Sequence, residues 1–170
     1  GVDTWDATTG KILWSTKWND QNAALKALIF TLDSKALIIA AGSTDLRDAQ
    51  TGKLIHKFNR PMPASAKQKP SDEVFEEQLA VAPVLSHDGK VLAKATMKTT
   101  YAPPPIRRMT VVDLWDVVTG KLLRTVTGGE RVLVGECDVV TGTLLHTEMS
   151  DPPTSMSFSV DNKVVLRLSM

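Results

Sequence analysis

The sequence predicts an all-β chain built from antiparallel strand-turn-strand units. Two observations carry this prediction: one turn motif occurs four times, and a second kind of turn occurs three times between apolar segments. A chain of 170 residues with 42% hydrophobic residues is long enough to bury a core. We therefore expect a single all-β domain over residues 1–170.

The first observation is the motif D-x-x-T-G, in which Asp and Gly keep fixed positions. An Asp carboxylate accepts backbone N–H groups just ahead of it, and Gly supplies the positive φ that closes a tight turn. A short apolar segment follows each copy, so the motif joins two strands and its role is structural. The turn residues are Asp6, Gly10, Asp48, Gly52, Asp116, Gly120, Asp138 and Gly142.

The second observation concerns residues 29–37, 84–92 and 157–165. In each segment an Asp-containing turn separates two apolar runs, which is typical of a β-hairpin. Together the two kinds of hairpin make a four-stranded unit. We name its strands a and b, joined by the second kind of turn, and c and d, joined by D-x-x-T-G.

The spacing of the turns indicates a β-propeller of four-stranded antiparallel blades. Asp6 and Asp48 are 42 residues apart, close to the length of about 40 to 45 residues of one blade. The interval from Asp48 to Asp116 is longer, which predicts a blade with insertions. The interval from there to Asp138 is too short for strands a and b, which predicts a stunted blade.

The chain is thus expected to start and end in mid-blade, with strands c and d first and strands a and b last. If these halves paired, they would close a small four-bladed ring and hide the exposed strand edges. The alternative is an incomplete ring, as in an excerpt of a larger propeller, whose open edges allow self-association.

Residues 114–123, LWDVVTGKLL, and residues 86–90, SHDGK, resemble the WD40 repeat family of β-propellers. The resemblance implies blades around a central channel, with strand a innermost, that serve mostly as platforms for binding other proteins. Trp5 and Trp115 keep the Trp of the Trp-Asp pair, whereas Arg47 and Cys137 replace it in the other repeats.

A second resemblance is to quinoprotein-like propeller repeats. Residues 6–14, DATTGKILW, place Trp14 four positions after the Gly, as those repeats do, but His56, Arg124 and His146 occupy the equivalent positions elsewhere. This likeness implies a redox or assembly role. A third hypothesis is a structural or sensor domain cut from a longer chain.

Composition narrows the classes of function. The net charge of +1, with scattered Lys and Arg, argues against nucleic acid as a partner, and no apolar run is long enough to cross a membrane. The single cysteine leaves the compartment undetermined, with the cytoplasm favoured. No nucleophile, phosphate-binding or metal-binding motif is present, so we expect neither an enzyme nor a cofactor or metal site.

Two insertions carry the residues most suited to binding another protein. They span residues 59–78, between strands d and a, and residues 99–108, between strands b and c, on the same face of the predicted propeller. Loops on a rigid scaffold commonly carry function, and Tyr and Arg are frequent at interfaces. The candidate interaction residues are Arg60, Lys67, Lys69, Phe75, Tyr101, Arg107 and Arg108.

Overall fold

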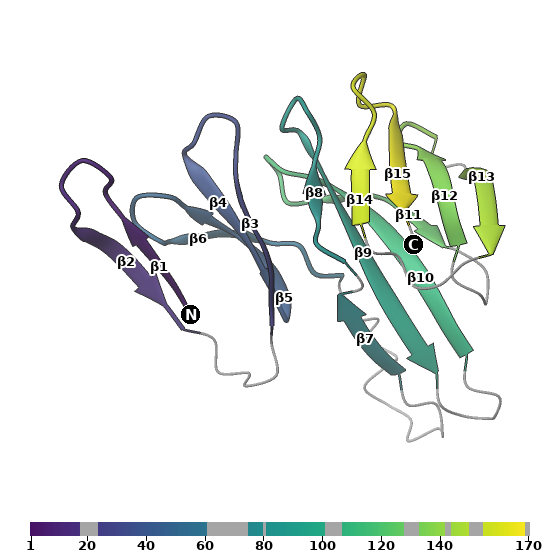
Figure 1. The fold of residues 1–170 in the computed structure, drawn as a ribbon, viewed down its shortest axis with the longest axis horizontal. Coiled ribbons are helices and arrows are strands. Elements are labelled where there is room, and N and C mark those ends of the chain that lie inside the picture. The colour runs from purple at the N-terminus through teal and green to yellow at the C-terminus, as the bar shows by residue number, and fades with distance from the viewer. Residues whose placement is uncertain are drawn as a thin grey trace. The chain divides into compact units, whose positions relative to one another are not determined.

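The computed structural model describes residues 1–17, 24–60, 75–79, 81–100, 107–127, 133–141, 144–149 and 155–168. Within them every regular element is a β-strand and all strands pair antiparallel, which confirms the all-β prediction (Figure 1). The chain divides into two compact units, Gly1–Asn59 and Arg60–Met170. In this described part no helix is long and apolar enough to span a bilayer.

The first unit contains one complete four-stranded sheet and one c–d hairpin. The hairpin pairs β1 (Val2–Trp5) with β2 (Ile12–Thr16). The sheet has its strands in chain order, as β3 (Leu25–Phe30), β4 (Ala36–Ala41), β5 (Ser43–Asp48) and β6 (Leu54–Lys57). These four strands correspond to a, b, c and d of the predicted unit.

Strand β4 forms the centre of the first unit because all six of its residues are apolar and buried. One side of the β1–β2 hairpin packs on it, where Val2 and Trp14 form a cluster with Leu37 and Ile39. A strand buried on both faces reads as a continuous apolar run rather than an alternating one, and ALIIAA has that pattern.

The second unit begins with the sheet that carries the insertions. It comprises β7 (Phe75–Leu79), β8 (Val84–Leu85), β9 (Val91–Thr100), β10 (Arg107–Asp116) and β11 (Leu122–Thr127). Strand β7 pairs with the C-terminal end of β9, and β8 pairs with its N-terminal end. Strand a of this sheet is therefore divided into two pieces. Pro83 lies between the two pieces, where a residue without an N–H group is tolerated.

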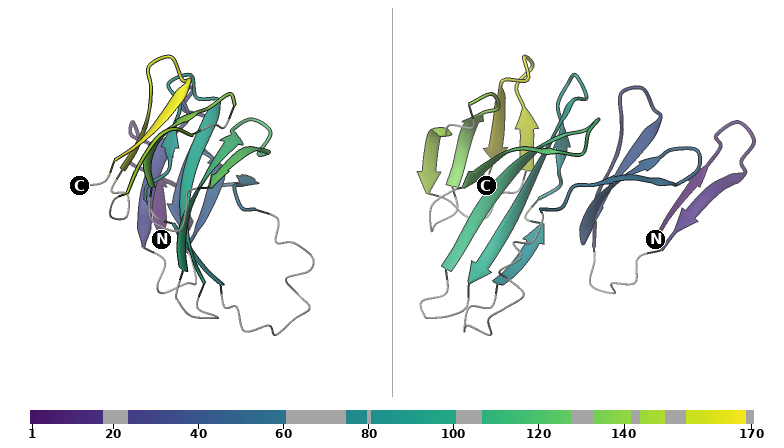
Figure 2. Two further views of the ribbon diagram at one scale, coloured as in Figure 1. Left: turned by 90° about the vertical axis from the view of Figure 1, so that its right-hand side faces the viewer. Right: turned by 180° about the vertical axis from the view of Figure 1, so that it is seen from behind.

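The predicted boundaries of both insertions are wrong. The expected loop over residues 99–108 includes the ends of two strands, because β9 continues to Thr100 and β10 starts at Arg107, opposite it. The expected loop over residues 59–78 includes most of β7. Residues 96–100, TMKTT, and 107–112, RRMTVV, are rich in β-branched side chains, which favour the extension of this hairpin. Figure 2 shows β9 and β10 continuing together along this extension.

The last sheet corrects the prediction of a stunted blade. It contains β12 (Leu133–Asp138), β13 (Leu144–Met149), β14 (Ser155–Phe158) and β15 (Val164–Leu168), in the spatial order β13-β12-β15-β14. The c–d hairpin comes first in the chain, and the last a–b hairpin completes it (Figure 1). Strand β15 therefore pairs with β12.

The core of the second unit lies where its two sheets face each other. Ala93 and Leu114 of the first sheet form a buried cluster with Phe158 and Val165 of the last one. A second cluster contains Val81, Ala95 and Met156. Burial of such side chains contributes about 25 cal/mol per Å² of apolar surface, so these clusters stabilise the packing of the two sheets.

The D-x-x-T-G turns share one hydrogen-bonding pattern. In the first copy, Oδ1 of Asp6 accepts the N–H groups of Thr8 at 2.9 Å and Thr9 at 2.7 Å. Gly10 has a φ of 68°, in the region that favours glycine. The other copies repeat the carboxylate contacts through Asp48, Asp116 and Asp138, and Gly52 and Gly120 have positive φ as well. Gly142 lies outside the described residues.

The turns of the a–b hairpins also depend on an Asp carboxylate. In the second unit, the Ser86 hydroxyl donates to Asp88 at 2.7 Å, and the amide of Lys90 donates to the same carboxylate at 3.1 Å. The other two turns have the same arrangement around Asp33 and Asp161. Each carboxylate thus replaces backbone hydrogen bonds that the chain loses at the turn.

These turns make stability dependent on pH. The amide and hydroxyl of Thr9 lower the pKa of Asp6, and those of Thr51 lower the pKa of Asp48. The pKa is likewise lowered for Asp33, Asp88, Asp138 and Asp161 by their own turn hydrogen bonds. Because a folded-state pKa below the unfolded one favours the folded chain above the unfolded pKa, we expect stability to fall as pH drops through the folded values.

Urea unfolding between pH 7 and pH 2 measures this dependence. The Asp48→Asn variant should be less stable at neutral pH and should lose less stability on acidification, since its turn carries no titrating carboxylate. If the stability of this variant depended on pH in the same way as that of the parent chain, the turn carboxylate of Asp48 would not be a source of the pH dependence.

Candidate functional site

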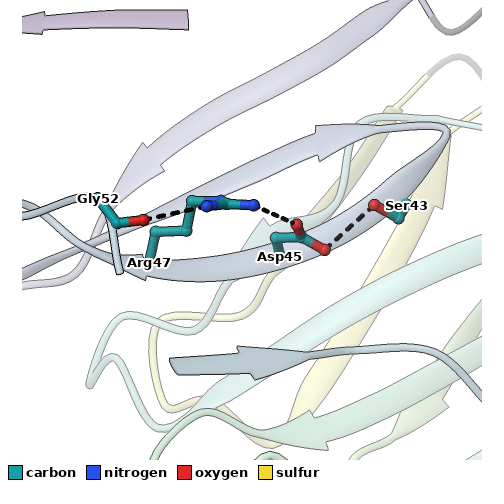
Figure 3. Close-up of polar contacts among 4 residues, drawn as sticks. All are labelled: Ser43, Asp45, Arg47 and Gly52. Atoms are coloured by element: carbon teal, nitrogen blue, oxygen red, sulfur yellow. Dashed lines mark hydrogen bonds and ion pairs between the residues drawn. The ribbon is translucent and has the colours of Figure 1, made fainter. Parts of the chain in front are cut away.

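The first unit has a small pocket between the β1–β2 hairpin and the four-stranded sheet. Its volume is about 70 Å³, and its polar end is formed by β5. Figure 3 shows that the Arg47 guanidinium lies between two acceptors, the Asp45 carboxylate at 3.2 Å and the Gly52 carbonyl at 3.0 Å. The Ser43 hydroxyl donates to the other oxygen of Asp45 at 3.1 Å. The lining residues are Thr16, Lys17, Ile39, Ala41, Ser43, Asp45 and Arg47.

The chemistry of this cluster is that of a polar packing contact. Asp45 is 8% exposed, and its charge is balanced by the Arg47 guanidinium. The pocket is far smaller than the roughly 300 to 1,000 Å³ typical of small-molecule sites. We therefore assign the cluster to holding β5 in place.

The second unit has an aspartate in the same repeat position. Asp113 precedes the turn aspartate by three residues, as Asp45 does, and is 1% exposed. The guanidinium of Arg60 donates to both of its carboxylate oxygens, at 2.7 and 2.6 Å, and the Thr125 hydroxyl donates at 2.7 Å. A buried carboxylate with this bidentate partner is well compensated.

Sequence reasoning missed this second aspartate, although the signal was present. Three of the four turns read D-x-x-D-x-x-T-G, with Asp3, Asp45 and Asp113 in the first position and Gly135 in the fourth copy. The exposed Asp3 accepts a hydrogen bond from Ser15 at 2.6 Å. In the two buried cases an arginine neutralises the carboxylate, so the position serves packing within a repeat.

Trp14 connects two successive repeats of the first unit. Its indole N–H donates to the carbonyl of Ala49 at 2.9 Å, and its ring lies against Gly52 in the same D-x-x-T-G turn. In the second unit Arg124 has the equivalent position and reaches the carbonyl of Thr141, again in the next turn, at 3.2 Å. The residue four places after the turn glycine thus fastens one repeat to the next in both cases.

Replacing Trp14 by Phe should therefore destabilise the chain by about 1 to 2 kcal/mol, since the buried Ala49 carbonyl loses its donor while most of the ring packing stays. The matched control is Trp5→Phe, because Trp5 is 57% exposed and should tolerate the change within about 0.5 kcal/mol. Urea unfolding of both variants gives the comparison. Equal losses of stability in the two variants would show that the hydrogen bond from Trp14 to Ala49 contributes nothing to stability.

The candidate interaction residues divide into three groups. Arg60 is engaged by Asp113, which gives it a structural role inside the second unit. Phe75 and Arg107 lie in strands rather than loops and pair with Thr100 of β9 from opposite sides, while Arg108 pairs with Thr99. The backbone therefore brings Phe75 and Arg107 to one end of this sheet. Lys67, Lys69 and Tyr101 lie outside the described residues.

Strand β3 carries large apolar side chains that are exposed. It lies at the margin of its sheet, with β4 as its partner. Leu28 and Phe30 are two positions apart, share a face of the strand, and are 47% and 53% exposed. Leu25, the first residue of the strand, and Leu32, in the turn that follows it, are exposed as well. We refer to Leu25, Leu28, Phe30 and Leu32 as the β3 patch.

No protein-family model matches this chain, and no curated protein matches it. Over the residues that the structure describes, no group of three His, Cys, Asp or Glu side chains is placed to hold a metal ion.

Proposed function

We propose that this protein is a non-catalytic scaffold of WD40-like repeats that binds another protein. The observation that carries the proposal is the β3 patch: large apolar side chains exposed along a strand at the edge of a sheet. Exposed apolar surface of this kind is costly in water and commonly marks a surface that another protein covers.

The repeat architecture supports the proposal. A rigid antiparallel sheet holds Leu28 and Phe30 at fixed spacing, because β3 is paired with the fully buried β4 along its length. Preorganised apolar side chains lose little entropy on binding. The WD40 resemblance adds that strand a is innermost in such blades, next to the central channel.

The test is retention of binding proteins by the immobilised chain and its variants. Leu28→Lys with Phe30→Lys should abolish retention of a partner that the parent chain retains, since two ammonium groups would be buried at the interface. Ile55→Lys is the matched control, because Ile55 is 45% exposed on β6, the opposite edge of the same sheet. If the double variant keeps the same partners as the control, the β3 patch is not the binding surface.

A second candidate is a quinoprotein-like propeller with a redox or assembly role. The contact of Trp14 with the next D-x-x-T-G turn favours it, because the Trp of this resemblance gains a defined packing partner in the following repeat. The redox form of this hypothesis predicts visible absorbance of a bound quinone, or oxidation of an alcohol after quinone and calcium are added. If the purified chain shows neither signal, only the assembly form of this hypothesis remains.

A further inference from the structure

The small pocket of the first unit has polar side chains on both of its sides. On the sheet, side chains of β5 alternate between the two faces, so Ser43, Asp45 and Arg47 share the face that lines the pocket. On the hairpin, Thr16 ends β2 and Lys17 follows it, and both line the pocket as well. Every residue that lines the pocket therefore belongs to the first unit.

The carboxylate in this pocket is already satisfied. Its two oxygens accept hydrogen bonds from the Ser43 hydroxyl at 3.1 Å and from the Arg47 guanidinium at 3.2 Å (Figure 3). The charges of Asp45 and Arg47 cancel in this ion pair. The pocket thus holds two cations and one carboxylate, and the ammonium group of Lys17 is the charge that remains.

The hairpin side of the pocket offers donors that lack acceptors. Among the described residues, neither the Thr16 hydroxyl nor the Lys17 ammonium group makes a hydrogen bond or an ion pair. The Arg47 guanidinium uses its N–H groups on both the Asp45 carboxylate and the Gly52 carbonyl, and has five such groups in all. Unpaired donors next to a surplus positive charge favour an anion with acceptor oxygens.

The volume of the pocket limits the size of that anion. A water molecule takes about 30 Å³ in the liquid, so a pocket of about 70 Å³ has room for roughly two waters or one small group. A carboxylate group has this size, whereas a nucleotide or a sugar is too large. Ile39 and Ala41 form the apolar part of the lining, which suits the carbon atom that carries a carboxylate.

We propose that this pocket binds the carboxylate group of a small ligand, with Thr16 and Lys17 as donors and the Arg47 guanidinium beside them. This inference goes beyond the proposed function, because it requires no protein partner and uses none of the residues of the β3 patch. The carboxylate comes either from a free organic acid or from an acidic side chain of a peptide, and both present the same group to the pocket.

Nuclear magnetic resonance of the full chain tests the binding of the group. Sodium acetate is the probe for a free acid, and a blocked tripeptide with one central aspartate is the probe for an acidic side chain. We expect saturable shifts of the Thr16, Lys17 and Ser43 amides with at least one of them. Acetamide, which has the shape of acetate without its charge, and sodium chloride at equal ionic strength should cause no saturable shift.

Variants of the two hairpin donors test their roles. Lys17→Gln should raise the dissociation constant of the bound probe about five-fold, since it removes the surplus charge from a partly exposed site. Thr16→Val keeps the shape of the side chain without its hydroxyl and should raise the constant about three-fold. The matched control is Lys11→Gln, because Lys11 is an exposed lysine at the other end of β2 and should not affect binding.

The source of the carboxylate follows from the two probes. Saturation by acetate assigns the pocket to a free acid, and saturation by the tripeptide alone assigns it to an acidic side chain. Any one of three results would overturn the inference: no saturable shift with either probe at high millimolar concentration, the same shifts with acetamide or chloride, or equal affinities for the parent chain and Lys17→Gln.

Discussion

Gly52→Ala should destabilise the chain by about 3 kcal/mol, clearly more than the same change at Gly10. Both glycines have positive φ, 70° and 68°, so both substitutions cost about 1 to 2 kcal/mol of backbone strain. At Gly52 the new Cβ would lie 2.6 Å from Cδ2 of Trp14 and 2.8 Å from its Cγ, whereas no atom lies within 4 Å at Gly10. The added cost is that of displacing a buried ring.

Gly10→Ala is thus a control with matched backbone geometry, and the difference between the two variants measures the ring contact alone. Urea unfolding followed by tryptophan fluorescence gives both stabilities. A combined variant, Gly52→Ala with Trp14→Leu, should lose less than the sum of the single changes because the clash is then absent. Equal destabilisation at both glycines would contradict the packing of Trp14 on the neighbouring turn.

Asp113→Asn should cost about 2 to 3 kcal/mol. The change keeps the shape of the side chain but leaves the Arg60 guanidinium without its counter-charge in a site where the carboxylate is 1% exposed. Removing one partner of a buried pair costs about 3 to 5 kcal/mol, and the partial exposure of Arg60 reduces that figure. Thermal or urea unfolding measures the loss.

Asp3→Asn is the control for this change, because Asp3 has the same repeat position but is exposed, and it should alter stability by less than about 0.5 kcal/mol. Replacing Arg60 and Asp113 together by Leu should be less damaging than replacing Asp113 alone by Leu, since no buried charge then lacks a partner. If the double variant were less stable than the single Leu variant, the burial of Asp113 would not depend on its ion pair with Arg60.

The sequence was sufficient to predict the all-β fold class and the local turns. An Asp followed by Thr and Gly at fixed spacing has few conformations available, so the turn at residues 6–10 follows from hydrogen bonding over four residues. It was not sufficient to predict contacts between residues that are distant in the chain. Arg60 and Asp113 are 53 residues apart, and nothing local distinguishes this arginine from the other cations of a basic, proline-rich segment.

The strand with which the last hairpin pairs could not be predicted from the sequence, for a different reason. All three a–b hairpins have the same register, so residues 155–168 are compatible with either β12 or β1 by pattern alone. Their apolar residues decide between the two, because Phe158 and Val165 are buried against Ala93 and Leu114 only in the observed arrangement. That cluster requires the packing of two sheets, which periodicity does not encode.

The pairing of β15 with β12 completes the last sheet. Val165→Cys places a second cysteine opposite the native Cys137, its Cα partner across the two strands. Paired strands bring Cα atoms within the range of a disulfide, so mild oxidation should form an intramolecular bond and remove both free thiols from the monomer. The comparison variant combines Trp5→Cys, Cys137→Ser and Val165→Cys, and should keep two free thiols. A disulfide in this variant, with Val165→Cys alone remaining reduced, would place β15 on β1 and contradict the account.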